Sequence, residues 1–350
     1  MKQRGAGVQQ ILRTHWSRIG FAHLLSFPAS LLFRALVALR RLLYKTSLLK
    51  TVMLPIPVIV VGNISVGGAG KTPLVMWLAT RLAARGMRPG IISRGYGGKL
   101  RGPYQVNRES DPRLVGDEPV LLAQRTACPV WIAHDRVAAA ARLLQQHPGC
   151  DVLIADDGLQ HYRLGRVIEI AVIDAASGLG NRLMLPAGPL REPASRLRSV
   201  TAIVVNGNGV DSKPEQSPVS LRPPIYPMTL RGAELGNLLN PDARIPVLSL
   251  RGLRVAALAG IGNPQRFFDH LAQLGLDFTA YPLPDHHVFS AGDLEIPDFD
   301  AIVMTEKDAV KCRAAAIGSE KCWVLDVEAV LPDALEDFII DKLRPGKTSR

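Results

Sequence analysis

Short runs of Val, Ile, Leu and Ala recur along the first two thirds of the chain, and stretches with helical spacing of apolar residues separate them. Runs this short and uniformly apolar are typical of strands that are buried on both faces. Because they alternate with helical stretches, the pattern predicts an α/β fold built on a mostly parallel sheet with helices on both faces. The expected strands are 57–61, 90–93, 129–132, 152–155, 168–173 and 202–205, and the expected helices include 74–85, 118–125 and 136–146.

A proline-rich, polar stretch at residues 207–227 interrupts this rhythm and predicts a domain boundary. A second set of alternating runs follows and predicts a second, smaller α/β domain. We therefore expect an N-terminal segment (1–50), a first α/β domain (51–215) and a second one (216–350). The second domain is expected to contain strands at 255–259, 301–304 and 322–325 and helices at 265–274 and 333–343.

The N-terminal segment has a different pattern, because residues 19–33 carry no charge and residues 29–44 are two-faced. The uncharged stretch is shorter than the about 20 apolar residues that a membrane span needs. From residue 29 onward, leucines collect on one side of the expected helix, while Arg34, Arg41 and Lys45 line the other. A basic amphipathic helix of this kind is typical of a segment that lies in a membrane interface. A single span and a helix packed on its own protein are the alternatives.

Charge is distributed unevenly along the 350 residues, whose formal net charge is +11. Residues 1–108 hold 17 Lys or Arg and no acid, whereas the remaining residues hold 25 basic and 31 acidic side chains. A positive N-terminal region favours an anionic partner. The scarcity of interleaved polar and aromatic residues there favours a membrane surface over nucleic acid. The four scattered cysteines disfavour a zinc site or a disulfide framework and fit a reducing compartment.

Residues 57–73, PVIVVGNISVGGAGKTP, carry the most specific motif in the chain. A predicted strand leads into a glycine-rich turn, and a helix with Pro73 in its first turn follows, which is the context of a P-loop. Backbone N–H groups of such a loop point at a polyphosphate, Lys71 would reach its β- and γ-phosphates, and Thr72 would offer its hydroxyl to Mg²⁺. Ser65 stands where the pattern has glycine. The expected phosphate-binding residues are Ser65, Val66, Gly67, Gly68, Ala69, Gly70, Lys71 and Thr72.

Adjacent acids occur at two places in the first domain. Asp156 and Asp157 directly follow the predicted strand 152–155. In P-loop enzymes a carboxylate in this position holds Mg²⁺ directly or through water. A turn with solvated acids is the alternative. Asp117 and Glu118 begin a predicted helix, where capping is the ordinary explanation.

Two further motifs leave their chemistry open. His286 lies in the segment PDHH, which offers too few ligands for a metal site and is also compatible with a satisfied loop histidine. Arg191 and Glu192 lie in the rigid segment LPAGPLREP, where the arginine would pair either with a phosphate or with a surface carboxylate.

These residues support three functional hypotheses. A membrane-surface lipid kinase would use both the P-loop and the basic N-terminal segment. A membrane-docked P-loop ATPase or switch protein, and a soluble P-loop kinase for a small metabolite, are the alternatives. A GTPase is rejected, because residues 305–308, TEKD, lack the spacing of a guanine-binding motif.

Eight segments together resemble the tetraacyldisaccharide 4′-kinases of lipid A biosynthesis, in that family's order and over nearly the whole chain. The resemblance implies ATP-dependent phosphorylation of the 4′-hydroxyl of a tetraacylated glucosamine disaccharide 1-phosphate, at the cytoplasmic face of a Gram-negative inner membrane. It also implies a P-loop NTPase-type kinase domain, nucleotide in the cleft between two α/β domains, and an N-terminal helix that dips into lipid. The segments are VIVVGNISVGGAGKTP, ISRGYGG, GDEP, DDGLQH, LPAGPLREP, AGIGNP, PDHH and TEKDAVK.

Site residues follow from the resemblance position by position. It implies that Asp117 is the catalytic base and that His286, from the second domain, is its partner. ATP and Mg²⁺ are the implied cofactors and a lipid A precursor is the substrate, with no nucleic acid and no obligate protein partner expected. Val167 departs from the family pattern, which has an acid there. Lys71 joins the catalytic pair, Arg191 joins the nucleotide site, and the expected metal-site residues are Thr72, Asp156, Asp157, Glu118 and Glu192.

Overall fold

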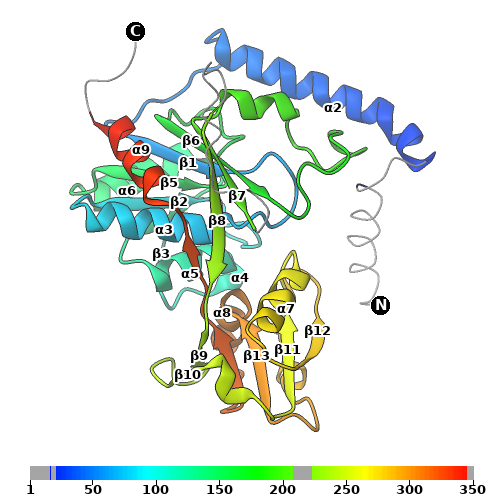
Figure 1. Cartoon of the computed structure of the whole chain (residues 1–350). Helices are drawn as coiled ribbons and strands as arrows, with labels where there is room; N and C mark the ends of the chain where they lie inside the picture. The colour runs from blue at the N-terminus through cyan, green and yellow to red at the C-terminus, as the bar shows by residue number, and fades with distance from the viewer. Residues whose placement is uncertain (1–15, 17–20, 208–222, 345–350) are drawn as a thin grey trace.

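The computed structural model describes Trp16 and residues 21–207 and 223–344, and its strands form two sheets (Figure 1). The larger sheet has the strand order β15-β8-β7-β6-β1-β5-β2-β4-β3. Its strands pair in parallel except at the two edges, where β3 and β15 are antiparallel to their neighbours, so the predicted mostly parallel sheet is confirmed. The strands are β1 (Val58–Gly62), β2 (Pro89–Ser93), β3 (Tyr104–Val106), β4 (Val130–Ile132), β5 (Val152–Asp156), β6 (Ile168–Asp174), β7 (Ala202–Asn206), β8 (Ile225–Arg231) and β15 (Glu328–Val330).

Helices cover both faces of this sheet because successive side chains of each strand point to opposite faces. In the central strand β1, Ile59 and Val61 pack on the face covered by α3, whereas Val58 and Val60 pack on the face covered by α6. The α3 face also receives α4, α5 and α9. These helices are α3 (Lys71–Ala84), α4 (Pro112–Val115), α5 (Asp117–Arg125), α6 (Arg136–Gln146) and α9 (Asp333–Leu343).

The smaller sheet has the strand order β10-β9-β14-β13-β11-β12, and its four strands from β14 to β12 are parallel. Apolar residues of α7 and of α8 are buried in separate clusters on its opposite faces. Its elements are β9 (Glu234–Asn237), β10 (Arg244–Pro246), β11 (Val255–Ala259), α7 (Pro264–Gln273), β12 (Thr279–Pro282), β13 (Ala301–Thr305), α8 (Glu306–Ala314) and β14 (Cys322–Leu325).

The division of the chain between the sheets differs from the predicted boundary between 51–215 and 216–350. β8, β15 and α9 follow that boundary in the sequence, yet they belong to the larger sheet and its cover. The chain passes from β8 into β9 and returns from β14 into β15, so two neighbouring strands connect the sheets (Figure 1). Met228 of β8 and Leu335 of α9 are buried beside α3. The burial of apolar side chains, rather than position along the chain, therefore assigns these elements to the larger sheet.

The predicted amphipathic helix forms part of α2 (Phe21–Lys45), which lies at the end of the larger sheet's domain away from the smaller sheet (Figure 1). Phe33 and Val37 pack on the core, and Ser30 Oγ donates to the carbonyl oxygen of Met184 at 2.8 Å. Residues 1–15 and 17–20 of the predicted segment lie outside the described residues. No helix within 21–207 or 223–344 is long and apolar enough to cross a bilayer. The large apolar side chains exposed on residues 25–45 of α2 are Leu25, Phe27, Leu31, Leu32, Leu36, Leu39 and Leu42.

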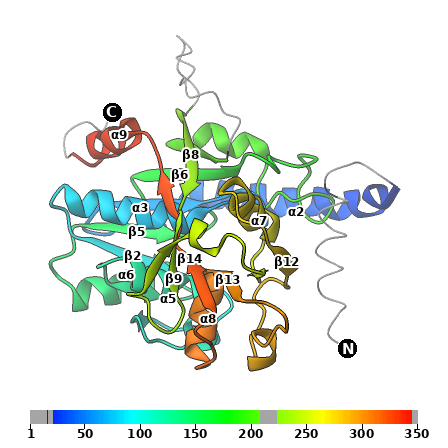
Figure 2. The ribbon, with the colours of Figure 1, turned by 60° about the horizontal axis from the view of Figure 1, so that its bottom comes forward.

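Helices α5 and α8 lie side by side and bring the two sheets together (Figures 1 and 2). Arg125, the last residue of α5, has its Nη1 3.2 Å from Glu306 Oε1 at the start of α8. The contact also joins the segments GDEP and TEKDAVK, which begin α5 and α8, because Lys307 Nζ lies 3.1 Å from Glu118 Oε1. It therefore positions residues of both sheets around a common site.

Candidate functional site

The P-loop connects β1 to α3 at the carboxyl edge of the larger sheet, in the strand–loop–helix context that the sequence predicts. Gly67 and Gly68 are exposed, and a Cβ built on Gly68 would have no atom within 4 Å, so the loop is open on this side. Gly70 has a φ of +90°, and a Cβ there would lie 2.0 Å from Nδ2 of Asn206. Both the backbone angle and this contact require glycine.

The segment LPAGPLREP runs along the P-loop. The Arg191 amide donates to the carbonyl oxygen of Ile64 at 2.7 Å, and Ser65 takes part in the same antiparallel pairing. Ser65 lies outside the left-handed region, so a side chain is tolerated where the motif has glycine. The pairing leaves Arg191 Nη1 3.3 Å from Asp157 Oδ2. It therefore places the predicted arginine beside the phosphate loop.

Lys71 begins α3 and lies beside Asp157. Its Nζ is 3.2 Å from Asp157 Oδ1 and 3.3 Å from Asn63 Oδ1, and Thr72 follows it in the first turn of the helix. Burial alone would raise the pKa of Asp157, but the charges of Lys71 and Arg191 outweigh this effect and hold that pKa below its usual value. The ammonium group and the amides at the start of α3 concentrate positive charge where a polyphosphate would bind.

Asp156 ends β5 and lies next to the P-loop, because β5 pairs in parallel with β1. Ser93 Oγ, at the end of β2, donates to Asp156 Oδ2 at 3.2 Å. The other carboxylate oxygen, Oδ1, is buried and has no hydrogen-bond partner among the described residues. Burial raises the pKa of Asp156 to about 7, and the nearby charges of Glu118 and Asp157 act in the same direction. This carboxylate would be stabilised by an added cation.

The acids at this edge fit a magnesium ion, although they do not form a complete cage. Within residues 21–207 and 223–344, no group of three or more His, Cys, Asp or Glu side chains is arranged to hold a metal ion. Mg²⁺ needs no such group, since it is commonly bound by one or two carboxylates together with waters and substrate phosphates. The unpartnered oxygen of Asp156, the neighbouring Asp157 and the hydroxyl of Thr72 are suitable oxygen donors.

Glu192 lies elsewhere, although it is adjacent to Arg191 in the sequence. Its side chain is 1% exposed and accepts hydrogen bonds from Tyr162 Oη at 2.6 Å and from Gln160 Nε2 at 3.0 Å. Arg196 Nε lies 3.2 Å from Glu192 Oε2, the oxygen that accepts the hydrogen bond from Tyr162. Because these three side chains already engage the carboxylate, we remove Glu192 from the expected metal-site residues.

Asp117 is the first residue of α5, and its carboxylate faces the smaller sheet. Oδ1 accepts a hydrogen bond from the Glu118 amide at 2.9 Å, and Oδ2 lies 3.1 Å from His286 Nδ1. His286 follows β12 in a loop where its own φ is +57°. The carboxylate therefore makes a local hydrogen bond at the helix start and also reaches a histidine 169 positions away.

Lys307, in the first turn of α8, is the third charged group at this contact. Its Nζ lies 3.1 Å from Glu118 Oε1 and 3.8 Å from Asp117 Oδ2. Burial alone would raise the pKa of Asp117, but the hydrogen bond from His286 and the charge of Lys307 hold that pKa below its usual value. The same hydrogen bond raises the pKa of His286, against the effect of burial. The pair is therefore a carboxylate beside a readily protonated imidazole.

The His286 loop lies close to the P-loop. A Cβ built on Gly262, which follows β11, would be 3.2 Å from Asp285 Oδ2 and 3.6 Å from the Gly68 nitrogen. Glu118, beside Asp117 in α5, is near enough to act on the pKa of Asp156. The carboxylate–histidine pair, the acids and the phosphate loop therefore converge between the two sheets.

Four polar residues of this site stand outside the sequence-based expectations, and all lie at the carboxyl ends of parallel strands. Asn63 follows β1, Ser93 ends β2, Asn206 ends β7 and Lys307 comes shortly after β13. Asn206 Nδ2 donates to the carbonyl oxygen of Ala69 at 3.0 Å and so stabilises the backbone of the P-loop. Because ligands of open α/β sheets bind at this edge, a polar residue at the end of an apolar run is the signal that could have identified them.

Comparison with known proteins identifies the family of this chain. The tetraacyldisaccharide 4′-kinase of Azoarcus sp. (strain BH72) is 48% identical over 97% of this chain and 98% of its own length. That of Aromatoleum aromaticum is 48% identical over 95% and 97%. The crystal structure of "apo" form LpxK from Aquifex aeolicus in complex with ATP has a TM-score of 0.75 and 30% identity, and covers 91% of this chain and 98% of that one. The family described as tetraacyldisaccharide-1-P 4′-kinase matches residues 22–344, and the chain therefore belongs to the tetraacyldisaccharide 4′-kinase family.

Proposed function

We propose that this chain transfers the γ-phosphoryl group of ATP to the 4′-hydroxyl of a tetraacylated glucosamine disaccharide 1-phosphate. Membership of the family supports the substrate and the reaction. The structural observation that carries the proposal is the carboxylate–imidazole pair of Asp117 and His286, which lies between the sheets beside an open P-loop. Nucleotide would bind in this cleft, with its phosphates on the loop.

The nucleotide would be held mainly by backbone amides of residues 65–72 and by two cations. Lys71 and Arg191 now lie against Asp157, at 3.2 and 3.3 Å, and both side chains would turn toward the β- and γ-phosphates. Phosphoryl transfer depends mostly on positioning and on charge stabilisation, because the transition state spreads negative charge over the equatorial oxygens. These two cations therefore carry much of the proposed catalysis.

Asp117 would accept the proton of the 4′-hydroxyl as that oxygen attacks the γ-phosphorus. The new bond joins the 4′-oxygen to phosphorus, and the bond that breaks joins phosphorus to the β–γ bridging oxygen, which leaves on ADP. His286 would orient the carboxylate through the 3.1 Å hydrogen bond, and Lys307 would keep it ionised from 3.8 Å. Both supporting groups come from the smaller sheet, so closure of the cleft would complete the site and exclude water.

Thr72, Asp156 and Asp157 would hold Mg²⁺, with Glu118 nearby. When bound, the ion supplies charge neutralisation at the β- and γ-phosphates. The buried Asp156 carboxylate, with its unpartnered oxygen, supports this assignment.

The acceptor is an amphiphile, and α2 supports a membrane-surface location. Its exposed leucines form an apolar face, and its basic residues suit an anionic surface. We propose peripheral binding at the cytoplasmic face of a Gram-negative inner membrane, where ATP is present. Deletion of residues 1–45 should release the protein from membranes, and unchanged partitioning would contradict this part of the proposal.

The test follows label from γ-³²P-ATP into the lipid A precursor disaccharide in mixed micelles with Mg²⁺. We expect the label on the 4′-oxygen and its loss in the Asp117→Asn variant. ATP hydrolysis without transfer would instead favour the membrane-docked ATPase or switch. Transfer to a water-soluble sugar without detergent would favour the small-metabolite kinase.

A further inference from the structure

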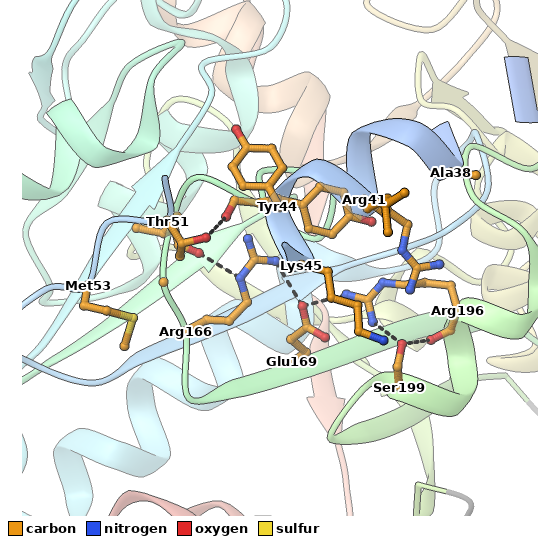
Figure 3. A pocket seen from close by; sticks show the side chains of 14 residues that line it. Ala38, Arg41, Tyr44, Lys45, Thr51, Met53, Arg166, Glu169, Arg196 and Ser199 are labelled. Carbon is orange, nitrogen blue, oxygen red and sulfur yellow. Dashed lines mark hydrogen bonds and ion pairs between the residues drawn. The ribbon is translucent and has the colours of Figure 1, made fainter. Parts of the chain in front are cut away.

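A cavity of about 630 Å³ lies between the C-terminal half of α2 and the beginning of β6 (Figure 3). This volume is in the range of pockets that bind small molecules. Thr51 and Met53, which line it, precede β1, and Glu169 is the second residue of β6, whereas the P-loop follows the end of β1. Since β1 and β6 are parallel, the length of a strand, roughly 15 Å, separates the cavity from the phosphate loop. The cavity is therefore separate from the nucleotide site.

The floor of the cavity contains two arginines that are already neutralised. Arg196 is 3% exposed, its Nη2 donates to Glu169 Oε1 at 2.6 Å, and its Nε lies 3.2 Å from Glu192 Oε2. Arg166 Nη1 donates to the same Glu169 oxygen at 3.0 Å. Two guanidinium groups thus face two carboxylates. The floor is polar and rigid but carries little net charge.

The wall formed by α2 carries positive charge that no carboxylate of residues 21–207 or 223–344 balances. Arg41 and Lys45 are four positions apart on this helix, so they lie on one face, and both line the cavity. Figure 3 shows them reaching from α2 toward the space above Arg196. Among the described residues, no carboxylate lies within 4 Å of either cation. Two unbalanced cations above a neutral polar floor favour an anionic ligand.

The rim of the cavity is apolar and continues the exposed leucine face of α2. Leu42 and Met53 both line the cavity, and they are 54% and 69% exposed. Tyr44 and Tyr162 lie on the same side, with ring centroids 5.8 Å apart, and tyrosine is favoured at the level of lipid headgroups. An anion that carries acyl chains would satisfy both the cationic wall and this rim, whereas a small soluble anion would leave the rim exposed to water.

We propose that this cavity binds the phosphate headgroup of an anionic phospholipid of the bilayer, which Arg41 and Lys45 hold by charge-assisted hydrogen bonds. The acyl chains would leave past Leu42 and Met53 along the apolar face of α2. This inference rests on the membrane contact proposed above for α2, and it assigns that contact a specific lipid. Free inorganic phosphate shares the same head chemistry, and the experiment below separates the two sources.

The experiment measures binding of the full chain to phosphatidylcholine vesicles with and without about 30% phosphatidylglycerol, at low salt and at roughly 0.5 M salt. One variant carries Arg41→Gln and Lys45→Gln. Its control carries Arg34→Gln and Lys50→Gln, two exposed basic residues that do not line the cavity. Both variants lose two positive charges, so both weaken diffuse attraction to the surface equally. Their thermal unfolding should match that of the unchanged protein.

The preference for phosphatidylglycerol is the ratio of the affinities for vesicles with and without this lipid. We expect this ratio to fall about tenfold further in the Arg41→Gln, Lys45→Gln variant than in the control, and this difference to persist at high salt. Equal losses in the two variants would overturn the inference and leave only diffuse attraction, with the membrane contact intact. No binding of the unchanged protein to either vesicle would contradict the membrane contact itself. Inorganic phosphate at matched ionic strength should not displace the protein; displacement would assign the cavity to the free anion.

Discussion

His286 Nδ1 lies 3.1 Å from Asp117 Oδ2, and this contact joins the smaller sheet to the larger one at the edge that carries the P-loop. The two residues are 169 positions apart. Each changes the ionisation of the other, because the hydrogen bond raises the pKa of His286 and helps to lower that of Asp117.

Asp117→Asn should lower the pKa of His286, since it removes the largest cause of its elevation. We also expect kcat for transfer to fall by about 10²–10⁴-fold, because a positioned base is lost. NMR titration of the imidazole measures the first effect, and labelled transfer measures the second. Asp285→Asn is the matched control, since Asp285 Oδ1 is 3.9 Å from His286 Nε2 and is the weakest of the named influences on that pKa. Equal pKa changes in the two variants would refute the pairing.

Lys71→Ala should reduce transfer by about 10³-fold or more, because it removes charge compensation at the phosphates. Asp156→Ala should do the same by weakening the magnesium site, and excess Mg²⁺ should restore part of that loss. Lys321→Ala, which removes an exposed lysine directly before β14, serves as the control. Normal transfer by the Lys71 variant would rule out the proposed phosphate site.

Gly70→Ala and Gly68→Ala should separate folding of the P-loop from phosphate binding. A side chain at position 70 meets both a φ of +90° and Asn206, so we expect a loss of at least roughly 1–2 kcal/mol in the free energy of unfolding. A side chain at position 68 meets no atom within 4 Å, so stability should not change, while ATP binding should weaken. Urea unfolding and calorimetric titration with ATP measure the two effects. Unweakened ATP binding by the Gly68 variant would place the phosphates elsewhere.

Glu192→Ala should lower stability rather than change the dependence of activity on Mg²⁺. Its removal leaves the Tyr162 hydroxyl without its buried acceptor and Arg196 with one carboxylate fewer, at a cost of roughly 3 kcal/mol. Gln160 would keep its hydrogen bond to the carbonyl oxygen of Asn63. Glu192→Gln retains an acceptor oxygen and should lose less. Urea unfolding tests the cost, and a magnesium titration of the remaining activity tests the role. A shifted magnesium requirement would return Glu192 to the metal site.

His161 should make folding sensitive to acid. Burial, with the charge of Arg136, lowers its pKa from 6.5 to about 4. The unfolded chain therefore takes up this proton at a higher pH than the folded protein does. The contribution of His161 to the free energy of unfolding is fully present above pH 6.5 and is lost as pH falls toward about 4. Unfolding free energy measured across this range should decline less steeply in His161→Gln, and an unchanged slope would assign the decline to other groups.

Local features of the fold could be predicted because their causes lie within short stretches of sequence. Apolar runs specify buried strands, and the glycines of residues 67–70 supply backbone angles that a tight strand–helix turn requires. Asp156 was predictable for the same reason, since a parallel strand that ends in an acid directs it to the carboxyl edge.

Other features depend on which elements pack together, and no short stretch contains that information. The boundary between the sheets was misplaced because β8 and α9 are held by burial beside α3, far away in the sequence. Lys307 reaches Asp117 only because α8 lies against α5.

The sequence by itself determined the strand–loop–helix of the phosphate site and the acids beside it, since backbone geometry and periodicity act over neighbouring residues. Only the tertiary structure decided that Arg191 points to the P-loop and Glu192 into a buried network, and that Asp117 meets His286. Such contacts arise when separate apolar faces are buried together, and the free energy of that burial belongs to the assembled sheets rather than to any one segment.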